Sequence, residues 1–286
     1  MEVLGTVHIV SNRIVKKEAK EPSPCFQNTF QQKGNLSMRN IKVTLAYDGT
    51  NYYGFQEQRG TPYQTIQGVV EDRLSRLAKR QIRVIGAGRT DTGVHARGQV
   101  VNFDAGSWKI GAERVAYALR SLLPEDIVAL ESVEVDPAFH ARFSAVSKSY
   151  RYTIYNGKYP SPFLRLFSYH VPNPLDDGAM REGAKYLLGR HDFSAFRALG
   201  TPVKSTVRTI LESRVNRVGD LIYIDVRGDG FLYHMVRMIA GTLIRVGKGK
   251  IPPGEVEDIL FEGDSLRGGP TAPARGLCLE KVEYHT

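Results

Sequence analysis

The chain has 286 residues, of which 42% are hydrophobic and 24% charged, a composition typical of a folded globular protein with one or two domains. No apolar run approaches the roughly 18–20 residues that cross a bilayer, and the first ten residues lack the basic leader of a secretory signal. A membrane protein is therefore not expected, and we predict a cytoplasmic location. The formal net charge of +9 is consistent with a polyanionic partner but does not identify one.

The cysteines and histidines give no sign of a metal or a disulfide framework. Cys25 and Cys278 are far apart in the chain and neither belongs to a paired motif. The seven histidines show no spacing typical of a metal site. We expect neither a metal nor a cofactor.

The first half of the chain predicts strands and helices in alternation after an irregular start. Residues 1–37 are polar and aperiodic, and we interpret them as a disordered extension or a misassigned start, because Met38 comes just before the first clear strand. Period-two alternation predicts strands, and apolar stripes of period 3.6 predict helices. The expected order is a strand over 41–47, a helix over 66–77 capped by Thr65, strands over 82–85 and 100–103, and a helix over 115–122.

The second half repeats this pattern. We expect a strand over 150–154, a helix over 180–188 capped by Asp176 or Asp177, a strand over 222–226, a helix over 235–246 and a last strand over 277–282. The regular βαβ rhythm and phosphate loop of a doubly wound fold are missing. The pattern therefore predicts an α+β fold with one mostly antiparallel sheet flanked by helices.

The segment Gly86-Ala-Gly-Arg-Thr-Asp-Thr-Gly-Val-His-Ala96 is the strongest candidate for a functional site. It places the carboxylate of Asp91 in a glycine-rich turn, two residues after the cation Arg89, between two expected strands. A carboxylate in such a place is suited to act as a nucleophile or to stabilise charge. A role as a simple turn cap stays open on this segment alone.

Two other motifs that overlap this turn can be set aside. A dinucleotide fingerprint needs a third glycine at position 91, where the chain has aspartate. Asp91-Thr92-Gly93 matches the triplet of aspartic proteases, but these need a second carboxylate that shares a proton, and the chain has no second triplet.

The full string from Gly88 to Ala96 resembles the signature of the TruA family of tRNA pseudouridine synthases. Four further segments resemble other motifs of that family in the same order, so that the resemblance covers about residues 40–286. They are Tyr47–Gln56, Phe139–Tyr152, His234–Arg237 with Gly241, and Thr271–Leu277.

The resemblance implies a fold, a domain division and a substrate. The fold would be two RRM-like, or ferredoxin-like, halves that share one central sheet, with the active-site cleft between them. The half over 38–145 would carry the catalytic aspartate, and the half over 146–286 would complete the cleft. The substrate would be uridine on the 3′ side of the anticodon arm of tRNA, isomerised to pseudouridine by a homodimer without a cofactor.

The same resemblance assigns roles to individual residues. Asp91, Arg89 and Arg237 would be the catalytic residues. Asp91 would be the nucleophile and Arg237 its basic partner, and Arg89 would reach into the RNA and help to hold the flipped base out of the stack. Tyr150 would stack on the target base, and we also expect His95 and Arg142 among the substrate-binding residues. An arginine in the otherwise apolar helix over 235–246 needs a buried carboxylate as its partner, independently of the resemblance.

Alternative interpretations remain for the protein and for two of these residues. Arg237 could pair with a different acid, and Tyr150 could be a core aromatic on its strand. The protein as a whole could be a noncatalytic RNA-binding protein or RNA chaperone with the same fold.

Overall fold

The computed structural model describes residues 39–285, apart from 59, 199–202 and 265. The predicted extension over 1–37 lies outside the described residues. The first half of the described chain contains β1 (Asn40–Tyr47), α1 (Ile66–Ala78), β2 (Ile85–Gly86), β3 (His95–Asp104), α2 (Ala112–Arg120) and β4 (Ile127–Val135). The second half contains β5 (Ala145–Tyr155), β6 (Tyr169–His170), α3 (Asp177–Lys185), β7 (Gly189–Asp192), β8 (Val207–Val218), β9 (Leu221–Gly228), α4 (Met235–Gly247), α5 (Glu255–Glu262) and β10 (Leu277–Tyr284).

The first half has the order of a ferredoxin-like unit. Its elements follow one another as β1-α1-β2-β3-α2-β4, and its strands lie in the order β4-β1-β3-β2. All of these pairings are antiparallel. Helix α2 packs against β4 and touches α1, so that both helices belong to this unit.

The second half repeats the same topology. Its main elements run β5-α3-β8-β9-α4-β10, and its strands lie in the order β10-β5-β9-β8, with the short β7 on the outer edge. Helix α3 packs against β8, and α4 packs against β5 and α3. The prediction of two similar α+β halves is therefore confirmed.

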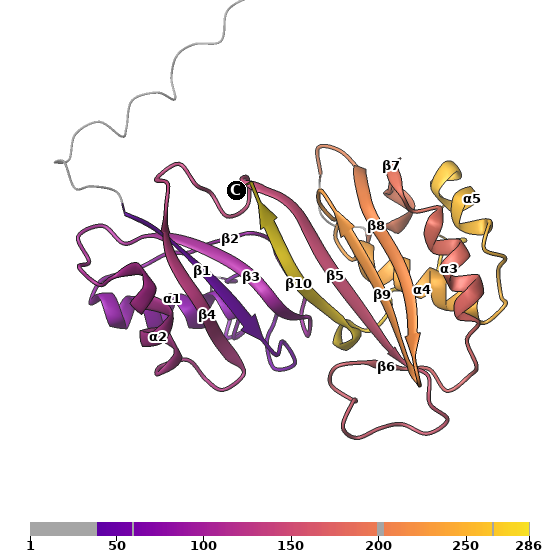
Figure 1. Ribbon diagram of the computed structural model, residues 1–286, viewed down its shortest axis with the longest axis horizontal. Helices are drawn as coiled ribbons and strands as arrows, with labels where there is room; N and C mark the ends of the chain where they lie inside the picture. The colour runs from indigo at the N-terminus through magenta and orange to yellow at the C-terminus, as the bar shows by residue number, and fades with distance from the viewer. Residues whose placement is uncertain (1–38, 59, 199–202, 265, 286) are drawn as a thin grey trace, which may run out of the picture. The chain divides into compact units, whose positions relative to one another are not determined.

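The two halves form one sheet because the edge of β3 that faces away from β1 pairs with two strands, β2 of its own half and β10 of the second half (Figure 1). Near its end, β3 pairs with β2 through Ile85 and Asn102. At its start, it pairs with β10 of the second half in parallel, through His95 and Cys278. The turn over 87–94, which joins β2 to β3, therefore lies where the two halves meet.

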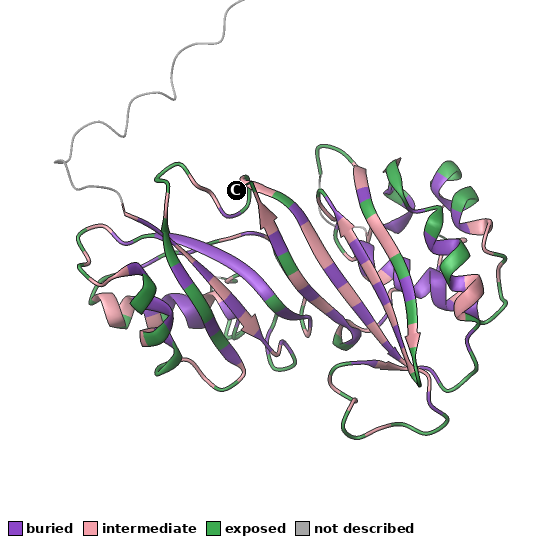
Figure 2. Cartoon of the chain, in the orientation of Figure 1, coloured by how far each residue is buried: buried purple, intermediate pink, exposed green. Residues whose placement is uncertain are grey.

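Buried residues alternate with more exposed ones along the strands, and the buried residues form the core (Figure 2). Ile41, Val43 and Leu45 of β1 are fully buried, and the residues between them are partly exposed. Tyr152 and Ile154 of β5 are likewise buried. This pattern matches the period of two that the sequence shows.

Helices α1 and α3 begin at side chains that cap them. The Oγ1 atom of Thr65 accepts a hydrogen bond from the amide of Gly68, as expected for α1. Of the two possible caps for α3, Asp176 is the one observed, since its carboxylate accepts from the amide of Ala179 at 2.9 Å.

Some boundaries differ from those predicted. The predicted strand over 82–85 is reduced to β2, because the amides of Ile82 and Val84 donate to the side chains of Ser75 and Glu71. These donors are therefore not available to a neighbouring strand. Helix α3 ends at Lys185, three residues before the predicted end.

Candidate active site

The backbone of the Asp91 turn is held in place by the segment that follows β1. The carbonyl of Thr90 accepts a hydrogen bond from the amide of Phe55 at 3.0 Å, and the hydroxyls of Thr90 and Tyr47 are 2.8 Å apart. Gly54 has a φ of +83°, and a Cβ at this position would lie 2.7 Å from the Thr90 carbonyl oxygen. Only glycine tolerates both the conformation and the close approach. This requirement gives a physical reason for Gly54, the second glycine of the Tyr47–Gln56 motif.

The start of the same turn is held by two polar side chains. The Nζ atom of Lys148 donates to the Ala87 carbonyl at 2.8 Å, and the amide of Gln99 donates to the Gly88 carbonyl at 3.0 Å. Lys148 comes from β5 of the second half, so both halves fix the turn. Burial lowers the pKa of the Lys148 ammonium to about 8, with a further contribution from the nearby charge of Arg142.

Helix α4 supplies the cation that faces Asp91. The Nη1 atom of Arg237 lies 3.1 Å from Oδ2 of Asp91, and the two side chains are 14% and 19% exposed. The pairing predicted from the isolated arginine in an apolar helix is confirmed. Such a nearby cation favours the ionised form of a carboxylate.

Arg237 is itself oriented by the segment over 269–273. Its Nε atom donates to the Ala272 carbonyl at 2.8 Å, and the Ala272 amide donates back to the Arg237 carbonyl at 3.1 Å. This segment lies directly against α4, because a Cβ at Gly241 would be 1.9 Å from the Pro270 carbonyl oxygen. The motif residues Gly241 and Thr271–Leu277 thus have a shared structural role next to the ion pair.

A histidine that the sequence did not single out also contacts Asp91. The Nε2 atom of His234 lies 3.5 Å from the same Oδ2 atom. The ring of His234 stacks on the ring of Tyr233 at a centroid distance of 3.9 Å. Burial lowers the pKa of His234, and the charge of Asp91 opposes this shift without cancelling it.

Tyr150 lies in the wall of the site, close to Asp91. Its ring is 8% exposed and packs edge-on against Phe231 at 5.0 Å. Burial raises the pKa of its hydroxyl, and the charges of Tyr47 and Asp91 add to this effect. The hydroxyl has no hydrogen bond to another described residue.

The other three predicted site residues lie in different surroundings. Arg89 is exposed and has no ion pair with any described residue, so the cation next to Asp91 is Arg237 and not Arg89. His95 is 5% exposed; its Nδ1 accepts from the Gly49 amide at 3.1 Å, and its Nε2 lies 3.0 Å from the Leu166 carbonyl. Arg142 is exposed, with its guanidinium 5.5 Å from the ring centre of Phe143.

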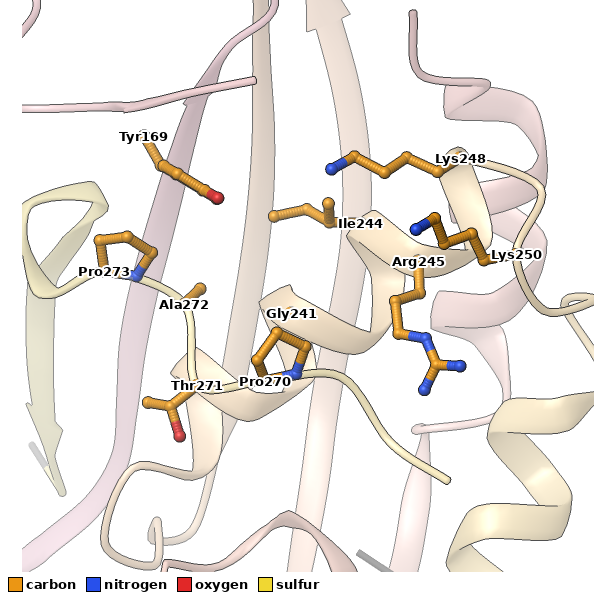
Figure 3. Close-up of a pocket in the computed structure, with 10 residues that line it drawn as sticks. All are labelled: Tyr169, Gly241, Ile244, Arg245, Lys248, Lys250, Pro270, Thr271, Ala272 and Pro273. Carbon is orange, nitrogen blue, oxygen red and sulfur yellow. The ribbon is translucent and has the colours of Figure 1, made fainter. Parts of the chain in front are cut away.

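A separate pocket of about 350 Å³ lies beside the second half of α4 (Figure 3). Its wall includes the segment over 270–273, Tyr169 and the basic residues Arg245, Lys248 and Lys250. The Arg245 guanidinium donates to the carbonyls of Arg267 and Gly268. Asp91 does not line this pocket.

The described part of the chain contains no cluster of three histidine, cysteine, aspartate or glutamate side chains that could hold a metal ion. Within the same residues, no helix has both the length and the apolar character needed to cross a membrane.

Comparison with known proteins identifies a single family. Residues 44–144 and 184–285 match the family model described as tRNA pseudouridine synthase. The chain is 51% identical over 244 residues to tRNA pseudouridine synthase A of Moorella thermoacetica, which covers 85% of this chain and 99% of that protein. It is 48% identical to the protein of the same name from Acetivibrio thermocellus, over 86% of this chain and 100% of that protein. Among solved structures, a Cbf5-Nop10-Gar1 complex aligns with a TM-score of 0.32 and 11% identity over 71% of this chain and 54% of that one, which is too low to bear on function.

Proposed function

Because the chain belongs to the family of tRNA pseudouridine synthases, we propose that it isomerises uridine to pseudouridine in the anticodon arm of tRNA, with Asp91 as the catalytic carboxylate. The observation that carries this proposal is the contact of Asp91 with Arg237 at the junction of the two halves. A carboxylate that only capped its turn would not need a cation from a helix 146 residues away in the sequence.

The reaction rearranges bonds within one nucleotide. The bond between the ribose C1′ and the base N1 breaks, the base turns, and a bond forms between C1′ and C5. C5 loses its proton and N1 gains one, so the product is an isomer and no oxidant or reductant takes part. Asp91 acts through its carboxylate, which the Arg237 guanidinium contacts at 3.1 Å.

We propose a separate role for each of the residues around Asp91. Arg237 is held by the Ala272 carbonyl and orients the carboxylate. Tyr150 offers a buried ring next to Asp91, on which the target base can stack. Arg89 is exposed next to the turn and contacts the RNA while the base is out of its stack. Arg142 adds a further exposed cation for the phosphates. Buried His95, at the end of the turn, accepts a hydrogen bond from the Gly49 amide.

The assembly and the setting are parts of the same proposal. The net charge of +9 supports binding to a polyanion, with phosphate contacts supplying much of the affinity. We propose that the protein acts in the cytoplasm as a homodimer that binds tRNA across both subunits.

The direct test is to map pseudouridine in tRNA from cells that lack the protein. We expect the modification to disappear from the anticodon arm, to return with the wild-type gene and to stay absent with an Asp91→Ala gene. Restoration by Asp91→Ala would point to a noncatalytic RNA chaperone, and an unchanged map in the deletion strain would refute the proposed substrate.

A further inference from the structure

His234 has a left-handed backbone at the third position of the turn Leu232–Met235, which the Met235 amide closes by donating to the Leu232 carbonyl at 3.1 Å. It precedes α4 as the N-cap residue with φ 62° and ψ 3°, in the left-handed region. N-cap residues normally have an extended backbone, and the His234 side chain makes no capping hydrogen bond. Residues other than glycine are rarely found in this region, and when they are, they often belong to functional sites.

The only other non-glycine residue with positive φ among the described residues is Lys79, at φ 49°. Lys79 is the C-cap of α1, and its amide donates to the carbonyls of Arg76 and Ser75. A left-handed residue after the last turn is a common way for a helix to end. Lys79 therefore ends a helix, whereas His234 precedes one, at a turn position that favours glycine or asparagine over histidine.

The conformation of His234 brings its ring to Asp91. Nε2 lies 3.5 Å from Oδ2, the atom that Arg237 also contacts. A carboxylate oxygen can only accept, so this contact is attractive when Nε2 carries a proton of the ring. The stacked ring of Tyr233 keeps the imidazole in this orientation.

Both basic contacts therefore fall on one oxygen of Asp91. Within the described residues, Oδ1 accepts no hydrogen bond. The Arg237 hydrogen bond and the nearby His234 ring, both at Oδ2, restrict the orientation of the carboxylate. Small errors in such an orientation reduce reaction rates strongly.

We propose that His234 is a positioning residue of the isomerase site, which holds Oδ2 of Asp91 together with Arg237 so that Oδ1 faces the uridine. This inference rests on the proposed function, since it concerns the same carboxylate. It adds a residue with a defined task and identifies the reacting oxygen.

Three substitutions separate the ring from the backbone. His234→Gly removes the ring and is relaxed in the left-handed region. His234→Asn tolerates that region, but its amide nitrogen reaches only to about the place of Nδ1. His234→Gln places an amide nitrogen near Nε2 and is strained at positive φ. If the contact with Oδ2 matters, kcat should fall in the order wild type, Gln, Asn and Gly, while thermal stability should be lowest for Gln.

The assay is turnover of tRNA that carries tritium at C5 of uridine, followed by release of tritium to water. We expect His234→Gly to stay folded and to lose about 100-fold in kcat, with KM changed little and with partial recovery in His234→Gln. Lys79→Gly is the matched control, because it relaxes the second left-handed residue and should keep wild-type kcat.

The results separate this inference from the proposed function. Wild-type kcat in a folded His234→Gly variant, or equal kcat in folded Gln and Gly variants, would overturn the positioning role while the isomerase remained established. If His234→Gln does not fold, the kcat of His234→Gly alone decides. An inactive wild-type protein would refute the proposed function itself, and this inference with it.

Discussion

Arg237→Met tests the ion pair on which the site depends. Methionine has a similar length and suits the apolar surroundings of α4, so the change removes the charge and little volume. Two groups lose their partner: the Asp91 carboxylate at 3.1 Å and the Ala272 carbonyl at 2.8 Å. We expect both the stability and the activity to fall.

The size of the effect follows from the burial of the pair. Removing one partner of a fully buried ion pair costs about 3–5 kcal/mol. Here the side chains keep 14% and 19% exposure, and His234 still contacts Asp91, so we expect a loss of about 2–3 kcal/mol. For a protein of this size, that lowers the melting temperature by about 4–12 °C.

The measurement is thermal unfolding of the two single variants and the double variant, with tRNA turnover measured in parallel. Asp91→Asn removes the charge that Arg237→Met leaves unpaired. The double variant should therefore recover about 1–2 kcal/mol relative to Arg237→Met alone. A melting temperature of Arg237→Met equal to that of the wild type, together with normal turnover, would refute the essential ion pair. Additive effects in the double variant would show that the two side chains do not interact.

Three further predictions concern neighbouring residues. Tyr150→Phe should keep substantial kcat and nearly unchanged stability, because the hydroxyl bonds to no described residue; complete loss of turnover would show that the hydroxyl takes part in the chemistry. Gly241→Ala should lower the free energy of unfolding by about 1–3 kcal/mol and impair turnover, because its Cβ would lie 1.9 Å from the Pro270 carbonyl oxygen. In the control Gly254→Ala, the new Cβ meets nothing within 4 Å. Equal effects of the two substitutions in chemical unfolding would contradict this reasoning. NMR titration of the Lys148 side chain should give a midpoint at about 8. As the pH rises, the folded protein loses this proton at a lower pH than the unfolded chain does. Lys148 therefore makes the unfolding free energy rise with pH above about 8. A midpoint at the usual lysine value would refute its burial.

The topology could be predicted wherever hydrophobic periodicity was strong. Strand β1 and helices α1 and α4 have clear apolar patterns and lie close to their predicted positions. Strand β8 was missed because only Ile210 and Val215 of its 12 residues are buried, so no alternating apolar pattern marks it. It forms by antiparallel pairing with β9, which follows it after a short turn, and this pairing depends on the sheet more than on the residues of β8.

The candidate site could be predicted in part. An arginine in an apolar helix indicated a buried acid, and the structure gives Asp91 as that partner. The role of Arg89 in holding the flipped base out of the stack stays a prediction, and its side chain is exposed beside the turn. His234 was missed because its contact depends on a left-handed backbone that its neighbours in the sequence do not specify. Lys148 shares the strand face of Tyr150, so a lysine among buried aromatics was a signal that could have been used.

The central claim is that Asp91 performs the isomerisation and is not needed to bind tRNA. The most direct measurement compares purified wild type with Asp91→Ala, using single-turnover tritium release from uridine-labelled tRNA and equilibrium binding of the same tRNA. We predict no release above background from Asp91→Ala, with a Kd close to that of the wild type. Release at a normal rate by Asp91→Ala would contradict the account.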